Sequence, residues 1–253
     1  MSAPRTRGRY QGVLQILQFN RDKYLIATTG IAAAALAWPF LATRGRVALL
    51  LGVLPGMFWV ASSLLVSHYI YDRFPLYDFR WIERLLTRVP TRWINIHSGW
   101  DETSSLLAAM FPAEGNRVVD IFDPRTMTES SIRQAQLMNQ NVVPAISARY
   151  DQLPFDTGVF DTAFAIFSAH ELRRHAERVD LFREIMRVLA PGGELVLTEH
   201  VRDWKNFLAF GPGFLHFFSR GEWRNAASEA GLMVRTEVAM TPFVRVYVLG
   251  KNL

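Results

Sequence analysis

The chain has 253 residues, half of which are hydrophobic, and its formal net charge is +5. This length allows one ordinary domain with additional segments, or two small domains. The abundance of aromatic and branched residues excludes a disordered or low-complexity protein. Cysteine is absent, which excludes disulfide bonds, thiolate metal sites and cysteine nucleophiles.

Nearly all of the positive charge is arginine, because lysine occurs only at positions 23, 205 and 251. The sequence contains no block of basic residues with interleaved aromatic residues, so we do not expect a nucleic acid as partner. A membrane surface is the better partner for this charge.

Two long uncharged runs lie near the start of the chain, at residues 24–42 and 47–71. Each is near or above the ~20 residues that a helix needs to cross ~30 Å of hydrocarbon. Only residues 43–46 separate them, which predicts a tight transmembrane hairpin of two helices. The alternative is a pair of buried core helices.

Arginine and lysine near the helix ends indicate the orientation. Residues 1–23 form a basic leader that we expect to lie along the membrane surface, and residues 72–92 form an interfacial elbow ending in an amphipathic helix. Both termini and the soluble part are therefore expected on the cytoplasmic side of the inner membrane. The hairpin could also contact other helices of a membrane protein complex.

Residues 93–253 show short apolar runs that alternate with amphipathic segments. The predicted strands are 93–97, 117–122, 142–147, 159–166, 194–199, 232–239 and 243–249. The predicted helices are 101–111, 128–138, 171–190 and 220–230. This alternation is typical of an α/β domain with a mostly parallel sheet and helices on both faces. The last two strands have no helix between them and should form a hairpin.

Two stretches of this domain, LPFDTGVFDTAFAIFSAHEL (153–172) and LFREIMRVLAPGGELVLTEH (181–200), carry a family resemblance. They resemble class I S-adenosylmethionine (SAM)-dependent methyltransferases of the type 11 kind. GEWRNAASEAGL (221–232) is similar to the late helix and turn of that family. The resemblance implies a Rossmann-like fold with a seven-stranded sheet, preceded here by the membrane hairpin, and SAM as cofactor.

The resemblance also places the cofactor loops. The loop after the first strand is usually rich in glycine, whereas the matching run here, Asn95 to Asp101, keeps only Gly99 and carries His97. Asp101 could equally cap the helix that follows. The family holds an acidic residue on the ribose hydroxyls after the second strand, where this chain has Asp123.

The third loop departs from the family pattern. Arg149 occupies the position of an aspartate that often contacts the adenine amino group, and arginine cannot accept a hydrogen bond. Tyr150 could still flank the ring, and Asp151 could substitute. The cofactor-binding residues that the resemblance implies are Asn95, His97, Gly99, Asp123, Tyr150 and Ser168.

Two polar clusters are candidates for the chemistry, because removal of a proton from a hydroxyl acceptor needs a base. His170 follows the fourth strand, and His200 with Asp203 follows the fifth. Histidine titrates near neutrality, so either histidine is a candidate base. The alternative is that His170 packs or caps and that Asp203 caps the next helix. No histidine and carboxylate spacing resembles a zinc motif, so we expect no metal.

The segment WKNFLAFGPGFLHFF (204–218) is strongly apolar and lies where the family has its acceptor-side insertion. Together with the predicted anchor, it favours a hydrophobic small-molecule acceptor such as a quinone, isoprenoid, pigment or fatty chain. The alternative is that the segment simply covers the sheet.

Two functions remain open at this point. The first is a membrane-anchored methyltransferase, which Asp123 and the polar clusters favour. The second is an inactive methyltransferase-like subunit of a membrane complex, which the depleted glycine loop favours. A Rossmann dehydrogenase is weakly supported, since no G-x-G-x-x-G follows the first strand.

Overall fold

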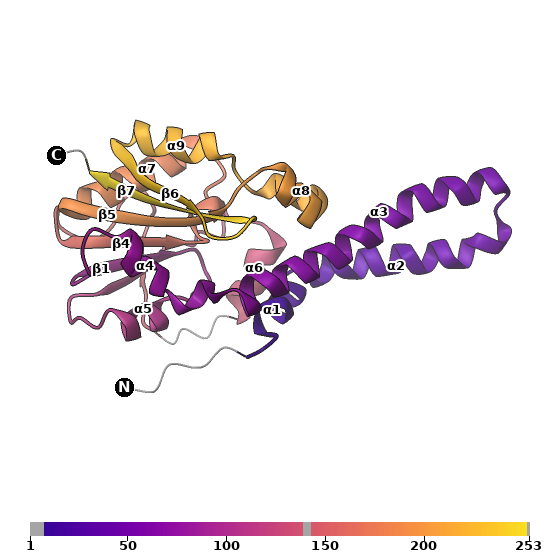
Figure 1. Ribbon diagram of the computed structural model, residues 1–253, viewed down its shortest axis with the longest axis horizontal. Coiled ribbons are helices and arrows are strands. Elements are labelled where there is room, and N and C mark those ends of the chain that lie inside the picture. Colours follow the sequence, from indigo (N-terminus) through magenta and orange to yellow (C-terminus); the bar gives the residue numbers. More distant parts are fainter. Residues whose placement is uncertain (1–7, 139–142, 252–253) are drawn as a thin grey trace.

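The computed structural model describes residues 8–138 and 143–251. The described chain consists of an α/β domain and a long helical hairpin that projects from one end of it (Figure 1).

The hairpin consists of α2 (Arg21–Ala37) and α3 (Thr43–His68), joined through the short helix η1 (Trp38–Phe40). By length and composition, one described segment, Thr43–Asp78, could cross a membrane, and none of its apolar window is buried. The shorter α2 does not meet this criterion. The predicted helical hairpin is therefore present, while its crossing of a membrane as two spans stays a prediction.

The elbow after α3 is irregular. A π-helical turn η2 (Tyr69–Arg73) and a 3-10 turn η3 (Pro75–Asp78) lead into α4 (Arg80–Leu85). Ile70 and Leu76 are fully buried and pack against Val244 of the domain. The elbow is therefore part of the folded core rather than a free linker.

The sheet has seven strands in the order β3-β2-β1-β4-β5-β7-β6, and only β7 runs antiparallel to its neighbours. The strands are β1 (Trp93–His97), β2 (Arg117–Asp120), β3 (Ile146–Ser147), β4 (Phe160–Ile166), β5 (Leu189–His200), β6 (Leu232–Ala239) and β7 (Val244–Lys251). The predicted α/β class and mostly parallel seven-stranded sheet are confirmed. The strand expected at 142–147 is only two residues long, and its first position lies outside the described residues.

Helices cover both faces of this sheet. The helices of the domain after β1 are α5 (Ser104–Met110), α6 (Ser130–Met138), α7 (His175–Val188), α8 (Trp204–Phe210) and α9 (Arg220–Glu229), with 3-10 turns η4 (Ala169–Glu171) and η5 (Gly211–His216). The helix predicted over 171–190 begins later, because residues 169–171 form η4, and it ends where β5 starts.

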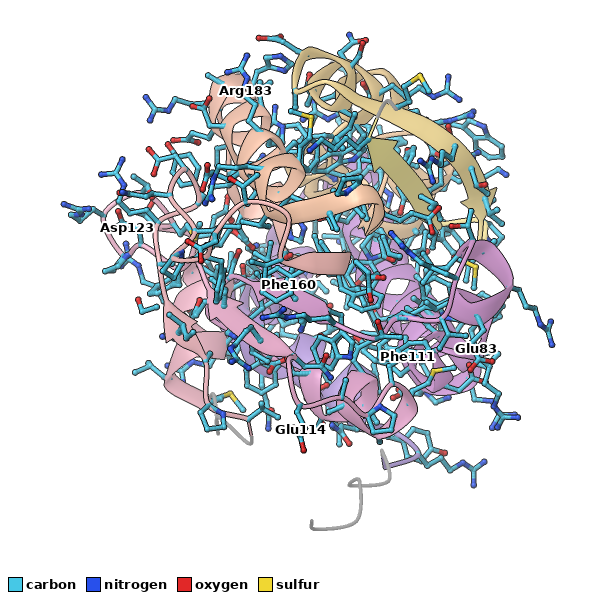
Figure 2. The ribbon with its side chains drawn as sticks, turned by 90° about the vertical axis from the view of Figure 1, so that its left-hand side faces the viewer. Glu83, Phe111, Glu114, Asp123, Phe160 and Arg183 are labelled. Atoms are coloured by element: carbon cyan, nitrogen blue, oxygen red, sulfur yellow. The ribbon has the colours of Figure 1, made fainter. Side chains whose placement is uncertain are left out.

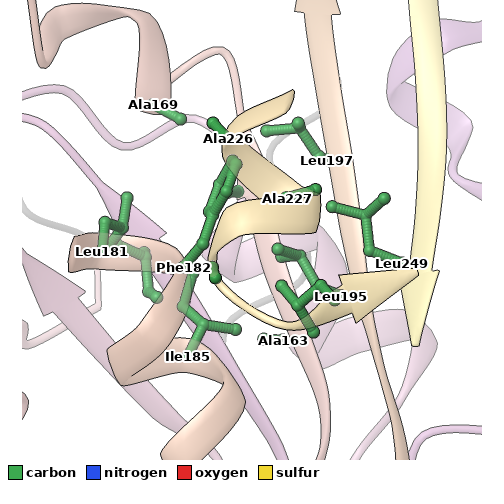
Figure 3. Close-up of a cluster of buried hydrophobic side chains, with 14 of the residues drawn as sticks. Ala163, Ala169, Leu181, Phe182, Ile185, Leu195, Leu197, Ala226, Ala227 and Leu249 are labelled. Atoms are coloured by element: carbon green, nitrogen blue, oxygen red, sulfur yellow. The ribbon is translucent and has the colours of Figure 1, made fainter. Parts of the chain in front are cut away.

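Each face of the sheet has its own apolar core. On one face, Phe182 and Ile185 of α7 and Ala227 of α9 pack against Leu195 and Leu249 of the strands (Figure 3). On the other face, side chains of α4 and α5 pack against Trp93, Phe164 and Val196. These two cores hold the strand ends in fixed register, and the strand ends carry the candidate site.

Helix α1 (Gln11–Phe19) lies against the elbow and α6 rather than apart from the domain. The buried carboxylate of Asp72 accepts hydrogen bonds from the backbone N–H groups of Gly12, at 2.6 Å, and Val13, at 3.1 Å. The first N–H groups of a helix have no partner within the helix, so a carboxylate at this end is stabilising. A side chain at Gly12 would clash with Tyr71, which explains glycine at this close approach.

We expect Asp72→Asn to release α1 from the elbow, because hydrogen bonds to a charged group contribute about 1.5–3 kcal/mol and the amide carries no charge. Amide hydrogen exchange of Gly12 and Val13 should accelerate about tenfold or more. The matched control is Asp22→Asn, whose exposed carboxylate pairs with its neighbour Arg21. Unchanged exchange of α1 in Asp72→Asn would show that something else holds the helix.

Candidate active site

A cavity of about 190 Å³ lies at the carboxyl ends of β1 and β4. Helix α1 contributes Gly12, Ile16 and Phe19 to its wall, and the elbow contributes Tyr71 and Tyr77. We call this space the first cavity. The leader helix and the elbow thus close the site from the side on which the hairpin emerges (Figure 1).

The loop between β1 and α5 is built around Gly99, which has a φ of +76°. Its N–H donates to Asp120 at the end of β2, 2.8 Å away, and the same carboxylate accepts from the N–H of Phe122. A Cβ at Gly99 would lie 3.1 Å from the Phe122 ring. The position therefore requires glycine for its backbone conformation and leaves little room for a side chain.

Two of the residues singled out in this loop, Asn95 and Asp101, make hydrogen bonds to neighbouring groups of the protein. Asn95 is buried and donates to the hydroxyls of Thr103 and Ser104, so it fastens β1 to the start of α5. The Asp101 carboxylate accepts from the backbone N–H of Thr103 and Ser104, which supports the capping role weighed above.

The other two predicted residues here are also buried. His97 is 3% exposed, and neither of its ring nitrogens has a hydrogen-bond partner among the described residues. Ser168 donates to the carbonyl of Ile96, while Ser98 donates to the carbonyl of Ser168. These bonds tie the ends of β1 and β4 together, and neither His97 nor Ser168 lines the first cavity.

A second cavity, of about 500 Å³, lies at the carboxyl ends of β2 and β3. Phe122, Asp123, Ala148 and Tyr150 are among its lining residues, so the structure brings the predicted Asp123 and Tyr150 together. Asp123 lies at the edge of the domain (Figure 2). Hydrogen bonds from Arg125 hold the pKa of its carboxyl at about 2, so it is ionised at neutral pH.

Phe122 and the Gly99 loop lie between the two cavities. Ser98 and Trp100, the neighbours of Gly99, line the first cavity, and Phe122 lines the second. A ligand that occupies both must therefore pass the contact between Gly99 and the Phe122 ring.

His170 lies in η4 and lines the first cavity. Its Nδ1 is 2.8 Å from a carboxylate oxygen of the buried Glu199, and its Nε2 is 3.4 Å from Glu171. Burial acts to lower the pKa of His170, but the charge of Glu199 and the bonds to both carboxylates outweigh it and raise this pKa to about 10. At neutral pH His170 therefore carries a proton and is not available as a base.

His200 is enclosed by aromatic rings, with Phe217 stacked on it at 4.7 Å. Burial lowers the pKa of His200 to about 3, so the ring is neutral. Its Nδ1 lies 3.1 Å from the carbonyl of Phe243 and must donate to it, so its Nε2 accepts from the Tyr71 hydroxyl at 2.7 Å. His200 does not line the first cavity and is too weak a base, so its role is to position Tyr71, which does line it.

Asp203 caps α8, since its carboxylate accepts from the N–H of Asn206. This is the capping alternative raised from the sequence. In the apolar segment 204–218, α8 lies beside α3, while Phe218 packs against the core on the sheet. Ser62 of α3 donates to the carbonyl of Leu208, and Trp59 meets the Phe207 ring edge to face.

Sequence reasoning missed three groups of the site. Asp120 ends β2 and holds the Gly99 loop. The sequence predicts a strand that continues to residue 122, which gives Asp120 no role in a loop. Tyr71 and Tyr77 lie in the elbow, far from the cavity in sequence. Glu171 and His216 come together only through η4 and η5, and no local motif marks them.

Several known proteins are similar to this chain. A family model described as "Methyltransferase domain" matches residues 101–197. Demethylmenaquinone methyltransferase of Thermus thermophilus is 30% identical over 147 residues, which cover 56% of this chain and 63% of that protein. A ubiquinone/menaquinone biosynthesis C-methyltransferase of Nitrosospira multiformis is 28% identical over 138 residues, covering 54% and 52%.

The family model and the two relatives name a methyltransferase domain that is similar to part of this chain. A solved SAM-dependent methyltransferase from Aquifex aeolicus has the same fold, with a TM-score of 0.53 at 18% identity, covering 76% of this chain and 98% of that one. The chain spans only about half to two thirds of the length of the two curated relatives. Neither the membrane hairpin nor the whole protein's substrate follows from these matches.

The raised pKa of His170 makes a prediction about stability. A group with an ordinary pKa of 6.5 and a folded-state pKa of about 10 stabilises the fold fully below pH 6.5 and loses that contribution as pH rises to 10. In metal-free buffer, the thermal midpoint of the parent should therefore exceed that of His170→Gln near pH 6, and the difference should shrink by pH 10.

A ¹³C NMR titration of the histidine rings checks this directly, with Glu199→Gln as control. The Glu199→Gln change removes the largest raising charge and should lower the pKa of His170. A parent resonance for His170 that titrates near pH 6.5 would contradict the argument.

Proposed function

We propose that the protein is a membrane-anchored methyltransferase that transfers a methyl group from SAM to a lipid-soluble acceptor. The observation that carries this proposal is the first cavity. It lies where ligands bind in sheets of this kind, and it is walled by α1 and by the elbow that leads to the exposed apolar helix α3. An acceptor dissolved in the membrane would need this arrangement.

The residues present fit SAM. The second cavity offers the ionised Asp123 for hydroxyl groups and the Phe122 and Tyr150 rings for a base. Gly99 has no side chain of its own, and the buried His97 ring nitrogens and the side-chain amide oxygen of Asn95 have no hydrogen-bond partner among the described residues, although His97 Nδ1 lies 3.7 Å from Asp120. The Phe122 side chain would have to turn away from Gly99 for one molecule to reach both cavities.

Bound SAM supplies an electrophilic methyl group, and the chain's own residues supply orientation and charge. In the metal-free chain, protonated His170 places a positive charge at the cavity wall that can stabilise negative charge on an acceptor oxygen, although it cannot take up a proton. Tyr71, fixed by His200, presents a further polar group at the cavity wall. The apolar majority of the wall, including Ile16, Phe19 and Phe167, favours a hydrophobic acceptor.

Among such acceptors we favour an isoprenoid quinone or a related ring. One relative is named a demethylmenaquinone methyltransferase and the other a ubiquinone/menaquinone biosynthesis C-methyltransferase. The apolar side chains of α8 and η5 support a position at the membrane surface, since Trp204 and Leu215 are exposed beside α3. We place the α/β domain on the cytoplasmic side of the inner membrane.

One observation favours a second function, an inactive subunit of a membrane complex. The Phe122 ring fills the space over Gly99, where a cofactor would approach the backbone. If this ring cannot move, the second cavity could hold only part of SAM. The hairpin would then serve to contact other membrane helices.

Calorimetric titration of the full chain in detergent with SAM separates the two functions. The parent should bind SAM, and Gly99→Val should bind at least about tenfold more weakly, because a branched side chain would crowd the ligand and strain the backbone. Asp123→Ala should also weaken binding.

Gly158→Val is the matched control for Gly99→Val. Gly158 has nearly the same φ, +75°, but lies outside both cavities. Its variant carries similar backbone strain and should keep the parent's affinity for SAM. Equal binding by Gly99→Val would misplace the pocket, and no binding by the parent at millimolar SAM would favour the inactive subunit.

Membrane anchoring is tested on expressed full-length protein by alkaline carbonate extraction. The parent should stay with the membrane, whereas Leu51→Arg with Leu54→Arg should be released, because each central arginine costs about 2.5–3.5 kcal/mol. Both leucines are exposed on α3. Leu137→Arg, an exposed apolar position of the domain, is the control and should behave like the parent. Extraction of the parent itself would refute the anchor.

A further inference from the structure

Three side chains from two distant segments converge at one end of the first cavity. His170 and Glu171 belong to η4, and His216 ends η5. One potential ligand atom of each lies within 4.8 Å of the others. The carboxylate oxygen Oε1 of Glu171 is 3.4 Å from His170 Nε2 and 3.8 Å from His216 Nε2.

The 3.4 Å separation matches that between two ligands of one zinc ion, and the 3.8 Å separation is somewhat longer. Ligand atoms at Zn–N and Zn–O distances of 2.0–2.2 Å in a tetrahedral site lie roughly 3.4 Å apart. The second carboxylate oxygen of Glu171 is buried and has no hydrogen-bond partner among the described residues. A buried oxygen without a partner is costly unless a cation or a proton occupies the space beside it.

The outer nitrogens of both imidazoles face carboxylates. His170 Nδ1 is 2.8 Å from Glu199, and His216 Nδ1 is 3.4 Å from Glu129. A carboxylate on the outer nitrogen holds a proton there, so the lone pair of the inner nitrogen points at the metal, an arrangement typical of histidine ligands. Here both inner nitrogens point to the same oxygen of Glu171.

Charge and rigidity agree with a divalent ion. With neutral imidazoles, the carboxylates of Glu129, Glu171 and Glu199 and the guanidinium of Arg173 leave two negative charges, which one divalent cation neutralises. Arg173 also donates to the carbonyls of His170, at 2.9 Å, and His216, at 2.7 Å. These two hydrogen bonds fix the backbones of His170 and His216 relative to each other.

We propose that His170, Glu171 and His216 form a binding site for a divalent transition metal ion of the zinc class, with an open position toward the first cavity. Two histidines and one carboxylate leave room for a further ligand, as in zinc sites that bind substrate or water. Since His170 and Glu171 line the cavity, that ligand would be an oxygen or nitrogen donor held there. The metal site itself does not depend on SAM binding.

The test is calorimetric titration of the tag-free full chain in detergent with Zn²⁺ after treatment with a chelator, at pH 8 because the metal displaces protons from the imidazoles. We expect one ion per chain. Co²⁺ provides a second readout, because the visible absorption of the bound ion reports coordination by nitrogen and oxygen at a low coordination number. His216→Ala and Glu171→Gln should each lose the bound ion and the Co²⁺ spectrum.

Two further variants guard against trivial explanations. Glu199→Gln leaves the three ligands in place and should weaken binding by about 10- to 100-fold, as the loss of an outer partner does. His175→Ala removes an imidazole that pairs with Glu222 and Glu229 elsewhere and should bind like the parent. Thermal unfolding of each variant verifies that it is folded.

Binding of Zn²⁺ by a folded His216→Ala protein with parental affinity would overturn the proposal. So would a folded parent that binds neither ion, and the cluster would then be held together by protons alone. Either result leaves SAM binding untouched, so failure of the metal site and failure of the methyltransferase can be told apart.

Discussion

The buried carboxylate of Asp72 connects α1 and the end of the hairpin helix α3 to the elbow of the α/β domain. It caps the first turn of α1 while also contacting Nδ1 of His68, the last residue of α3. Because Asp72 belongs to the elbow, whose Ile70 and Leu76 are fixed in the core, the capped helix is held over the strand ends. The first cavity exists only because α1 stands there. Without it, the ends of β1 and β4 would open to solvent.

A second constraint follows from the strand ends themselves. Asp120 ends β2 and binds the N–H groups of Gly99 and Phe122 with one carboxylate oxygen. This interaction sets the distance between the first two loops of the sheet. It also brings the Phe122 ring over Gly99, so the same group fixes the loop proposed to receive the cofactor and the ring that obstructs it. The balance between an enzyme and an inactive subunit rests on how easily that ring turns.

Much of the fold could be predicted from the sequence, because it depends on local pattern. The apolar alternation at 93–97 and 232–239 gave strands with the observed bounds. The helix of 171–190 and the strand of 142–147 were predicted too long, since a 3-10 turn and a short edge strand leave no distinct periodicity. The site was harder to predict. Asp123 and Tyr150 are predicted through the family resemblance and line the second cavity, whereas Tyr71 reaches the first cavity, and His216 approaches Glu171, only by tertiary packing. The sequence predicts His170 as a base, whereas the structure makes it a protonated cation. This difference depends on Glu199, which is 29 residues away in sequence.

The proposed function requires that a methyl group passes from SAM to a lipid-soluble acceptor in the first cavity. The direct measurement incubates the full chain, reconstituted in vesicles with membrane lipid extract, with SAM labelled in its methyl group. The proposed function predicts that label enters the lipid fraction and that this transfer requires the folded protein. Bound SAM without any label in the lipid fraction would contradict it.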